Sequence, residues 1–375
     1  MSKNGITIEI YKMNFKLAEP IAISFHTFYY RENVLVKLVW NGIEGLGEAA
    51  PFKPITGDSQ EDVIKSLETL NLAGINPETV TLDDFAAYLD THIKGQTTKC
   101  ALDFAYHDLV GKIKGVPIYK LYTDSPQLIP NSVTVFIRNP EATKKETQRL
   151  LTLYPHLQVL KIKLKGKDDL ERVKVIKEAC PPDLKFILDA NQGFSDPRKA
   201  VSDLNAIVAI LKNVILIEEP CPKGDLDKLK YVTDHIQGAY IFADESAVDY
   251  QDVEKIVKKQ AAHGINIKLQ KAGGITLGKK LAQLAKKGGL KVMVGSMLEG
   301  PVAITCGVHF GVSTENVILT DLDMDLDLPR HQRGEALFQD GQRIPTEFPG
   351  HGVTFDEKMI IKLAQTHNLV FERLL

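Results

Sequence analysis

The pattern of hydrophobic and polar positions changes at about residue 130 of this chain. Before that point, apolar and polar residues alternate at 6–10 and 33–40, which predicts strands of a β-meander with a turn at Asn41-Gly42. The aromatic-rich stretch 22–30 between these strands is interpreted as a loop, and so is 51–58, which carries Pro and Gly. Apolar residues then recur at helical spacing over 62–70, 82–92 and 97–114. Strands followed by helices predict an α+β segment.

Beyond residue 130, short apolar runs alternate with amphipathic stretches. The runs cover 132–137, 159–164, 185–188, 214–217, 240–242, 265–269, 292–294 and 317–319. Helices are predicted between them at 141–154, 168–179, 197–211, 225–235, 249–260, 277–286 and 301–310. This order is typical of a parallel sheet, and eight strands with connecting helices predict a closed barrel. A last helix is not evident after residue 319, so the predicted class is α/β, a modified (β/α)7β TIM-type barrel.

The same pattern predicts the domain boundaries. Residues 1–128 form the α+β segment and residues 129–329 form the barrel. The tail, 330–375, is rich in Gly and Pro and then helical from Asp356, and we expect it to pack back on the N-terminal segment.

Composition narrows the class of protein. Hydrophobic residues make up 44% and charged residues 25%, and the formal net charge is -2. This balance argues against a nucleic acid or an anionic membrane as the main partner. Residues 1–12 hold no apolar signal core, and no run of about 18 apolar residues follows that could span a membrane. The four scattered cysteines form no Cys-x-x-Cys pair, so free thiols in a reducing cytoplasm are expected.

Five predicted strands end in a charged residue, at intervals of 24 to 29 residues. These residues are Lys163, Asp189, Glu218, Asp244 and Lys268. The repeat of a barrel with eight units is about 30 residues, and active sites of such barrels lie at the C-terminal ends of the strands. A single acid at a strand end is more often a helix cap or part of a surface loop, but five in register favour a site.

The chemistry follows from the residue types. Three carboxylates on adjacent strands would repel each other, and a hard divalent cation with oxygen ligands, Mg²⁺, resolves this repulsion. Lys161 and Lys163 would face Lys268 across the barrel. Two neighbouring lysines on one strand more often form a solvated face. Beside a metal, however, crowded ammonium groups have depressed pKa values and can act as bases. Two bases near a metal-bound carboxylate suit removal of the proton on the α-carbon, and the metal stabilises the ene-diolate.

At this point the chain resembles the enolase superfamily, in particular the muconate-lactonizing enzyme subgroup and, within it, the dipeptide epimerases. The motifs that carry the resemblance are 161–163 (KIK), 188–193 (LDANQG), 218–220 (EEP), 243–246 (ADES), 267–275 (IKLQKAGGI) and 294–299 (VGSMLE). The resemblance implies that 1–128 is a capping domain. It implies Mg²⁺ ligands at Asp189, Glu218 and Asp244, acid/base residues at Lys163 and Lys268, and support of the substrate carboxylate by Lys161.

Substrate-binding residues are expected at the other strand ends. Asp321 and Asp323 alternate on one face of 320–327, and Leu326 replaces the Gly that an EF-hand would need. A solvated sheet edge is the plain interpretation. Dipeptide epimerases similarly carry Asp-x-Asp here to hold the ammonium group of the dipeptide, although Met324-Asp325 departs from their pattern. By the same resemblance, Thr134 and Met297 lie at substrate-binding positions.

The loops of the capping domain would select the side chain of the substrate. The stretch 19–27 is similar to a first specificity loop, and 55–58 to a second one. Epimerases selective for Ala-Glu carry Arg at the position of His26. Arg binds a carboxylate bidentately and His does not do so reliably, so the second residue of the dipeptide is left open.

The sequence therefore predicts an isomerase that epimerises an L-Ala-L-Xaa dipeptide at its C-terminal α-carbon, with Ala-Glu as one candidate. The first alternative is a lyase or cycloisomerase of the same subgroup, such as muconate cycloisomerase or o-succinylbenzoate synthase. Asp321 and Asp323 argue against it because those anionic substrates carry no ammonium group. The second is a catalytically silent binding protein on this fold, which the full set of lysines and carboxylates disfavours. A homo-oligomer is left open, and the lysine-rich stretch 161–167 lacks the aromatic residues of a nucleic-acid site.

Overall fold

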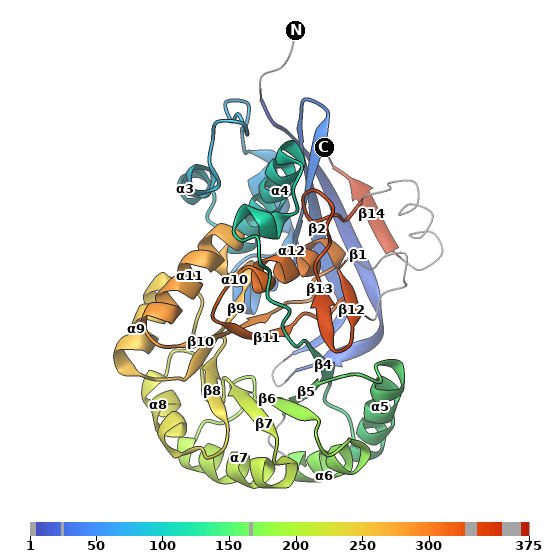
Figure 1. The fold of residues 1–375 in the computed structure, drawn as a ribbon, viewed down its shortest axis with the longest axis vertical. Helices are drawn as coiled ribbons and strands as arrows, with labels where there is room; N and C mark the ends of the chain where they lie inside the picture. Colours follow the sequence, from blue (N-terminus) through green and yellow to red (C-terminus); the bar gives the residue numbers. More distant parts are fainter. Residues whose placement is uncertain (1–4, 24–25, 165–167, 327–335, 355–368, 375) are drawn as a thin grey trace.

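The computed structural model of the 375-residue chain describes residues 5–23, 26–164, 168–326, 336–354 and 369–374. Figure 1 shows two parts of the molecule. One is an antiparallel sheet with its helices, and the other is a parallel sheet enclosed by a ring of helices. The predicted fold class, a modified barrel with an α+β capping domain, is confirmed. The boundaries at 128/129 and 329/330 stay a prediction.

The capping domain is built on a four-stranded sheet in the order β14-β1-β2-β3. Its strands are β1 (Thr7–Ala22), β2 (Thr27–Trp40), β3 (Ile43–Ala49) and β14 (Leu369–Arg373). Its helices are α1 (Lys53–Thr56), α2 (Gln60–Glu68), α3 (Leu82–His92), α4 (Gln96–Lys114) and the 3-10 helix η1 (Ile118–Leu121). The loop predicted at 22–30 is wrong over most of its length, because the pairing of β1 with β2 continues to Ala22 and Thr27.

Helix α4 lies between the capping sheet and the barrel and is buried on nearly all its faces. Gly45 and Gly47 allow β3 to press against it. A Cβ at Gly45 would stand 2.1 Å from the carbonyl oxygen of Ala105, and one at Gly47 would stand 1.8 Å from that of Ala101. Larger residues would therefore force the sheet off the helix.

The barrel contains eight parallel strands in sequential order, from β4 to β11. They are β4 (Ser132–Val135), β5 (Val159–Lys163), β6 (Lys185–Asp189), β7 (Val214–Glu218), β8 (Tyr240–Ala243), β9 (Gly264–Lys268), β10 (Lys291–Gly295) and β11 (Val317–Asp321). Its helices are α5 (Pro140–Leu153), α6 (Asp169–Ala179), α7 (Pro197–Leu211), α8 (Leu226–His235), α9 (Tyr250–Lys259), α10 (Leu269–Ala272), α11 (Ile275–Lys287) and α12 (Pro301–Val312).

A backbone bridge and the side chain of Asn131 close the barrel between its first and last strands. The amide N–H of Thr320 donates to the carbonyl of Pro130 at 3.0 Å, and Asn131 Oδ1 accepts from Thr320 Oγ1 at 2.9 Å and from the N–H of Leu322 at 2.9 Å. The barrel is thus nearly closed, and the residues at its rim are drawn together.

Apolar side chains fill the lower part of the barrel and leave the polar ones above them. The inward layer consists of Val159, Ile187, Leu216, Phe242, Met293 and Leu319. Lys161, Asp189 and Glu218 each stand two positions after a residue of this layer on the same strand. Because side chains of a strand alternate with period two, they also point into the barrel. Leu160 and Ile162 pack outward against the helices.

The described part of the tail contacts both the barrel and the capping sheet: the carbonyl of Gly341 accepts from the N–H of Asn131, just before β4, at 2.8 Å, and β14 lies beside β1. Strands β12 (Leu337–Gln339) and β13 (Gln342–Ile344) form a hairpin, and β14 pairs with β1. His351 accepts a hydrogen bond on Nδ1 from the N–H of Val353, and its own N–H donates to Asp108 of α4 at 2.9 Å. The helix predicted from Asp356 lies outside the described residues.

Two buried carboxylates of the capping domain bind the N-termini of barrel helices. Glu48 accepts from the N–H groups of Gly300 at 2.8 Å and Ala303 at 3.1 Å, at the start of α12. Asp103 accepts from the N–H of Ile275 at 2.6 Å and from Thr276 Oγ1 at 2.7 Å, at the start of α11. Each satisfies amide groups that have no partner within their helix.

The described helices include none that is both long enough and apolar enough to cross a membrane. The four cysteines are free, as predicted.

Candidate active site

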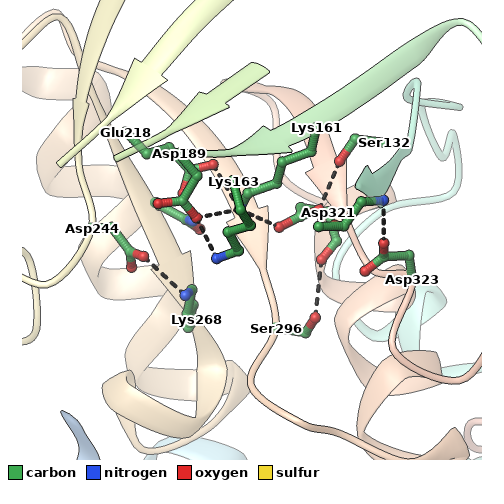
Figure 2. Close-up of polar contacts among 12 residues, drawn as sticks. Ser132, Lys161, Lys163, Asp189, Glu218, Asp244, Lys268, Ser296, Asp321 and Asp323 are labelled. Carbon is green, nitrogen blue, oxygen red and sulfur yellow. Dashed lines mark hydrogen bonds and ion pairs between the residues drawn. The ribbon is translucent and has the colours of Figure 1, made fainter. Parts of the chain in front are cut away.

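Charged side chains from five barrel strands meet at the C-terminal rim (Figure 2). Lys163, Asp189 and Glu218 are register partners across β5, β6 and β7. Strand β9, which ends in Lys268, is separated from β5 by three strands and thus lies across the barrel. The spacing in the sequence therefore reflects a real convergence of side chains.

Lys161 is surrounded by carboxylates. Its Nζ lies 2.6 Å from Asp321 Oδ2, 2.8 Å from Glu218 Oε1 and 3.0 Å from Asp189 Oδ2. The side chain is almost fully buried, so these ion pairs are poorly screened. Burial opposes the charged form, but the three carboxylates together raise the pKa of Lys161 well above its usual value.

The two lysines predicted to be bases are held by different partners. Lys163 Nζ donates to Asp189 Oδ2 at 2.6 Å and to Asn191 Oδ1 at 3.1 Å. Lys268 Nζ lies 2.9 Å from Asp244 Oδ2. Burial acts to lower the pKa of Lys268, but Asp244 outweighs it and raises that pKa. In this arrangement the nearest charge to Lys268 is a carboxylate, so the lowered pKa predicted for a lysine crowded beside a metal stays a prediction.

Three carboxylates predicted to bind a metal lie on adjacent strands but have unlike environments. Burial would raise the pKa of Asp189, yet Lys161 and Lys163 lower it well below its usual range. Asp244 shows the same balance, with Lys268 and Lys271 as its cations. Burial raises the pKa of Glu218 to about 8. Among the three carboxylates, Glu218 is therefore the one in which nearby lysines offset the effect of burial on the pKa least.

The donor atoms suit a hard cation. Glu218 Oε1 and Asp244 Oδ2 are buried and have no hydrogen-bond partner, although ammonium groups lie near both. Glu245 Oε2 is likewise buried and without a hydrogen-bond partner, and burial raises the pKa of Glu245 to about 8. All of these donors are carboxylate oxygens, the ligands that Mg²⁺ prefers. Among the described residues, no three His, Cys, Asp or Glu side chains converge closely enough to hold a metal as they stand.

The residues around these carboxylates are the ones that reasoning from sequence missed. Lys271 Nζ donates to Asp244 Oδ1 at 2.7 Å and to the carbonyl of Asp244. Asn266 Nδ2 donates to Glu218 Oε2 at 2.8 Å. Glu219 accepts from the N–H of Asp244 at 2.7 Å and thereby fixes the end of β8. Lys271 and Glu219 stood within the motifs, but their direction could not be read from a linear pattern.

Asp321 and Asp323 face the first strand of the barrel. Asp321 Oδ1 accepts from Ser132 Oγ at 2.7 Å, and Asp323 Oδ2 accepts from the N–H of Thr134 at 2.7 Å. Asp323 Oδ1 is buried without a hydrogen-bond partner. Burial and the charge of Asp321 raise the pKa of Asp323 to about 7. Asp325, the next alternate aspartate, instead pairs with Arg343.

An apolar pocket stands above the charged residues. Its apolar lining comprises Ile21, Ile23, Phe28, Phe52, Ile55, Phe136, Met297, Leu298 and Met324, and its polar lining comprises Thr134, Lys161, Lys163, Asn191, Glu245, Lys268, Ser296 and Asp321. His26 is exposed and packs on Phe28 and Phe52, with ring centroids 4.6 and 5.0 Å away. Thr134 and Met297 thus lie in the pocket wall, while His26 packs against two wall residues, Phe28 and Phe52.

Comparisons with known proteins agree with this geometry. The family model described as mandelate racemase / muconate lactonizing enzyme, N-terminal domain, matches residues 5–122, and the model described as enolase C-terminal domain-like matches residues 144–359. An L-Ala-D/L-Glu epimerase of Clostridium acetobutylicum is 30% identical over 355 residues, 92% of this chain and 97% of that protein.

Solved structures are similar over nearly the whole chain. The N-succinyl Arg/Lys racemase of Bacillus cereus has a TM-score of 0.88 and 27% identity, with 100% of both chains covered. A dipeptide epimerase of Enterococcus faecalis, in complex with Mg and the dipeptide L-Leu-L-Tyr, has a TM-score of 0.82 and 28% identity, with 95% of this chain and 100% of that chain covered.

Proposed function

The chain belongs to the mandelate racemase / muconate lactonizing enzyme family of the enolase superfamily, and from this premise we propose that it is a dipeptide epimerase. It is an isomerase that moves a proton at the α-carbon of the C-terminal residue of an L-Ala-L-Xaa dipeptide. The observation that carries the proposal is the placement of Lys163 and Lys268 on strands that face each other across the barrel.

Asp189, Glu218 and Asp244 are the residues that would hold Mg²⁺. When bound, the cation neutralises the negative charge that develops on the substrate carboxylate during proton removal. The buried carboxylate oxygens of Glu218 and Asp244 that lack hydrogen bonds support this role. Binding requires that the ammonium groups of Lys161 and Lys268 yield their contacts with these oxygens. Lys161 then supports the substrate carboxylate.

The proton transfer itself uses the two lysines. One lysine removes the α-proton from its face of the carbon, and the other returns a proton to the opposite face. Their fixed positions supply the orientation, and the buried rim excludes water from the carbanionic intermediate. A neutral lysine is required on the side that removes the proton.

The amino end of the substrate is assigned to Asp321 and Asp323. The buried oxygen of Asp323 that has no hydrogen-bond partner supports this, because an ammonium group would supply the missing donor. Two carboxylates at this point also disfavour substrates with an anionic group here, such as N-succinyl amino acids or muconate.

The side chain of the C-terminal residue is proposed to be apolar. The wall that the capping domain contributes consists of Ile21, Ile23, Phe28, Phe52 and Ile55. The cations among the described lining residues are the lysines that serve the chemistry. A glutamate side chain would lose its hydration there without gaining a partner, whereas a leucine side chain gains about 1.5–3 kcal/mol from burial.

Deuterium exchange tests the function. We expect the enzyme with Mg²⁺ in D₂O to place deuterium on the C-terminal α-carbon of L-Ala-L-Leu and to form the L-Ala-D-Leu epimer, observed by ¹H NMR. Lys163→Ala and Lys268→Ala should each abolish epimerisation. N-succinyl-L-leucine and muconate serve as competing substrates. Turnover of either one, with no exchange in any dipeptide, would show that the chain is not a dipeptide epimerase.

A further inference from the structure

We propose that Asn191 and Glu245 are positioning residues that hold Lys163 on its own face of the substrate through hydrogen bonds that do not extend to Lys268. This inference rests on the proposed function, since it assigns a support to only one of the two bases. The proposed function assigns Mg²⁺ to Asp189, Glu218 and Asp244 and gives neither Asn191 nor Glu245 a role in binding; whether Glu245, whose Oε2 has no hydrogen-bond partner, also reaches the metal is an outcome of the test below.

A chain of hydrogen bonds joins the three residues. Lys163 Nζ donates to Asn191 Oδ1 at 3.1 Å, and Asn191 Nδ2 donates to Glu245 Oε1 at 3.2 Å. The ammonium group can only donate and the carboxylate can only accept. The amide of Asn191 must therefore present its oxygen to Lys163 and its nitrogen to Glu245, and Glu245 fixes the direction of the amide.

The backbone holds Asn191 in place for this task. Its φ is +39°, in the left-handed region, where asparagine is tolerated better than most residues. Its own N–H donates to Asp189 Oδ1 at 3.0 Å, and the next N–H, that of Gln192, donates to the carbonyl of Glu219 at 2.7 Å. The side chain of Asn191 is thereby turned inward from the end of β6.

The support reaches one lysine and not the other. Glu245 follows β8, so the hydrogen-bond chain spans from β8 over β7 to Lys163 of β5. Lys268 instead contacts Asp244 Oδ2 at 2.9 Å, and Glu245 acts on it through its charge alone. Both Asn191 and Glu245 are nearly fully buried and line the pocket, so no bulk solvent replaces their contacts. Loss of either one should misplace Lys163 alone.

The two epimers of the substrate report on the two lysines separately. Exchange without inversion requires only the lysine that faces the α-proton. In D₂O, Lys163→Ala should lose exchange from one epimer and Lys268→Ala from the other, which assigns a lysine to each epimer. Asn191→Gly, which suits a positive φ, and Glu245→Ala should then lower exchange from the Lys163 epimer by about 10²-fold and from the Lys268 epimer by at most about threefold.

Two control variants distinguish a positioning role from damage to the fold: a conservative substitution of Glu245 and a substitution of the residue next to Asn191. Glu245→Gln keeps an oxygen that can accept from Asn191, so it should recover most of the loss seen in Glu245→Ala. Gln192→Gly changes the adjacent residue, also at positive φ (+65°), whose Oε1 accepts from the N–H of Lys223 at 3.0 Å. It should leave the ratio of the two exchange rates at the wild-type value.

Several results would overturn the inference. One is an equal loss from both epimers in Asn191→Gly and Glu245→Ala while the wild type exchanges normally. Another is weaker Mg²⁺ binding in Glu245→Gln, seen as a smaller Mg²⁺-induced shift in Tm, because it would place Glu245 on the metal. Lack of exchange by the wild type itself would overturn the proposed function together with this inference.

Discussion

Replacing His26 with arginine should extend the substrate range toward acidic side chains. His26 is exposed and packs against Phe28 and Phe52, whose own centroids lie 4.7 Å apart. An arginine at this position can lie along the same rings and place its guanidinium group at the mouth of the pocket. It would supply the partner that a γ-carboxylate lacks in the wild type.

The expected size of the effect follows from the apolar wall. Burial of a leucine side chain contributes about 1.5–3 kcal/mol, and an unpaired buried carboxylate costs several kcal/mol. The wild type should therefore prefer L-Ala-L-Leu over L-Ala-L-Glu by about 10³-fold in kcat/KM, since about 1.4 kcal/mol corresponds to tenfold. A charge-assisted hydrogen bond contributes about 1.5–3 kcal/mol when buried, and the exposure of residue 26 reduces this. We expect His26→Arg to raise kcat/KM for L-Ala-L-Glu by about tenfold.

The assay compares three dipeptides with wild type, His26→Arg and His26→Gln. L-Ala-L-Gln matches glutamate in size without the charge, so a gain confined to L-Ala-L-Glu identifies the guanidinium group as its cause. His26→Gln should show no gain. The reasoning is refuted if the wild type already favours L-Ala-L-Glu over L-Ala-L-Leu, or if His26→Arg improves both the glutamate and the glutamine dipeptide equally.

Three further outcomes are expected. Asp103→Ala should lower the free energy of unfolding by about 3 kcal/mol in urea titrations, because it leaves buried N–H groups at the start of α11 without a partner. As a control, replacing the exposed Asp83 with alanine should change the free energy of unfolding by less than about 0.5 kcal/mol. Equal effects of the two substitutions would contradict the capping role of Asp103. Burial lowers the pKa of His309 to about 3. The unfolded chain therefore takes up the proton first, so its contribution to stability is present above pH 6.5 and falls by about 1.4 kcal/mol per pH unit below that value. His309→Gln should flatten this slope in pH-dependent unfolding, and an unchanged slope would contradict the assignment. EDTA should lower Tm, and Mg²⁺ at a hundredfold excess over Kd should raise the free energy of unfolding by about 2.7 kcal/mol and restore Tm. Glu218→Gln should lose this effect, and a Tm indifferent to Mg²⁺ in the wild type would argue against the metal site.

The alternation of apolar runs and helices was sufficient to predict the barrel. Each strand from β4 to β11 carries an apolar run bounded by helix signals, and the structure agrees within about two residues at most ends. The end of the β1–β2 hairpin could not be predicted in this way. The aromatic residues at 22–30 carry no period-two pattern, and their pairing depends on contacts with the partner strand. The short β12–β13 hairpin and the pairing of β14 depend on contacts distant in sequence.

The residues of the site likewise fall into those that the sequence could predict and those that it could not. Side chains that point inward from a strand, such as Lys163 and Asp189, follow from period two and regular spacing. Groups whose direction depends on a loop do not. Asn191 and Glu219 face the site because their backbones adopt positive φ, and Lys271 does so from the short helix α10. Local pattern carries no information about these angles.

The contacts of Glu48 and Asp103 with the barrel bear on how far this protein can be treated as modular. Specificity resides in loops of the capping domain and chemistry in the barrel, which invites chimeras that graft the cap of one relative onto the barrel of another. Here the cap supplies the terminating groups of α12 and α11, and Glu48 also accepts from Asn33 at 2.6 Å. A transplanted cap must therefore bring matching acids to these two helix ends, or the barrel that receives it will lose stability at the loop that carries Met297.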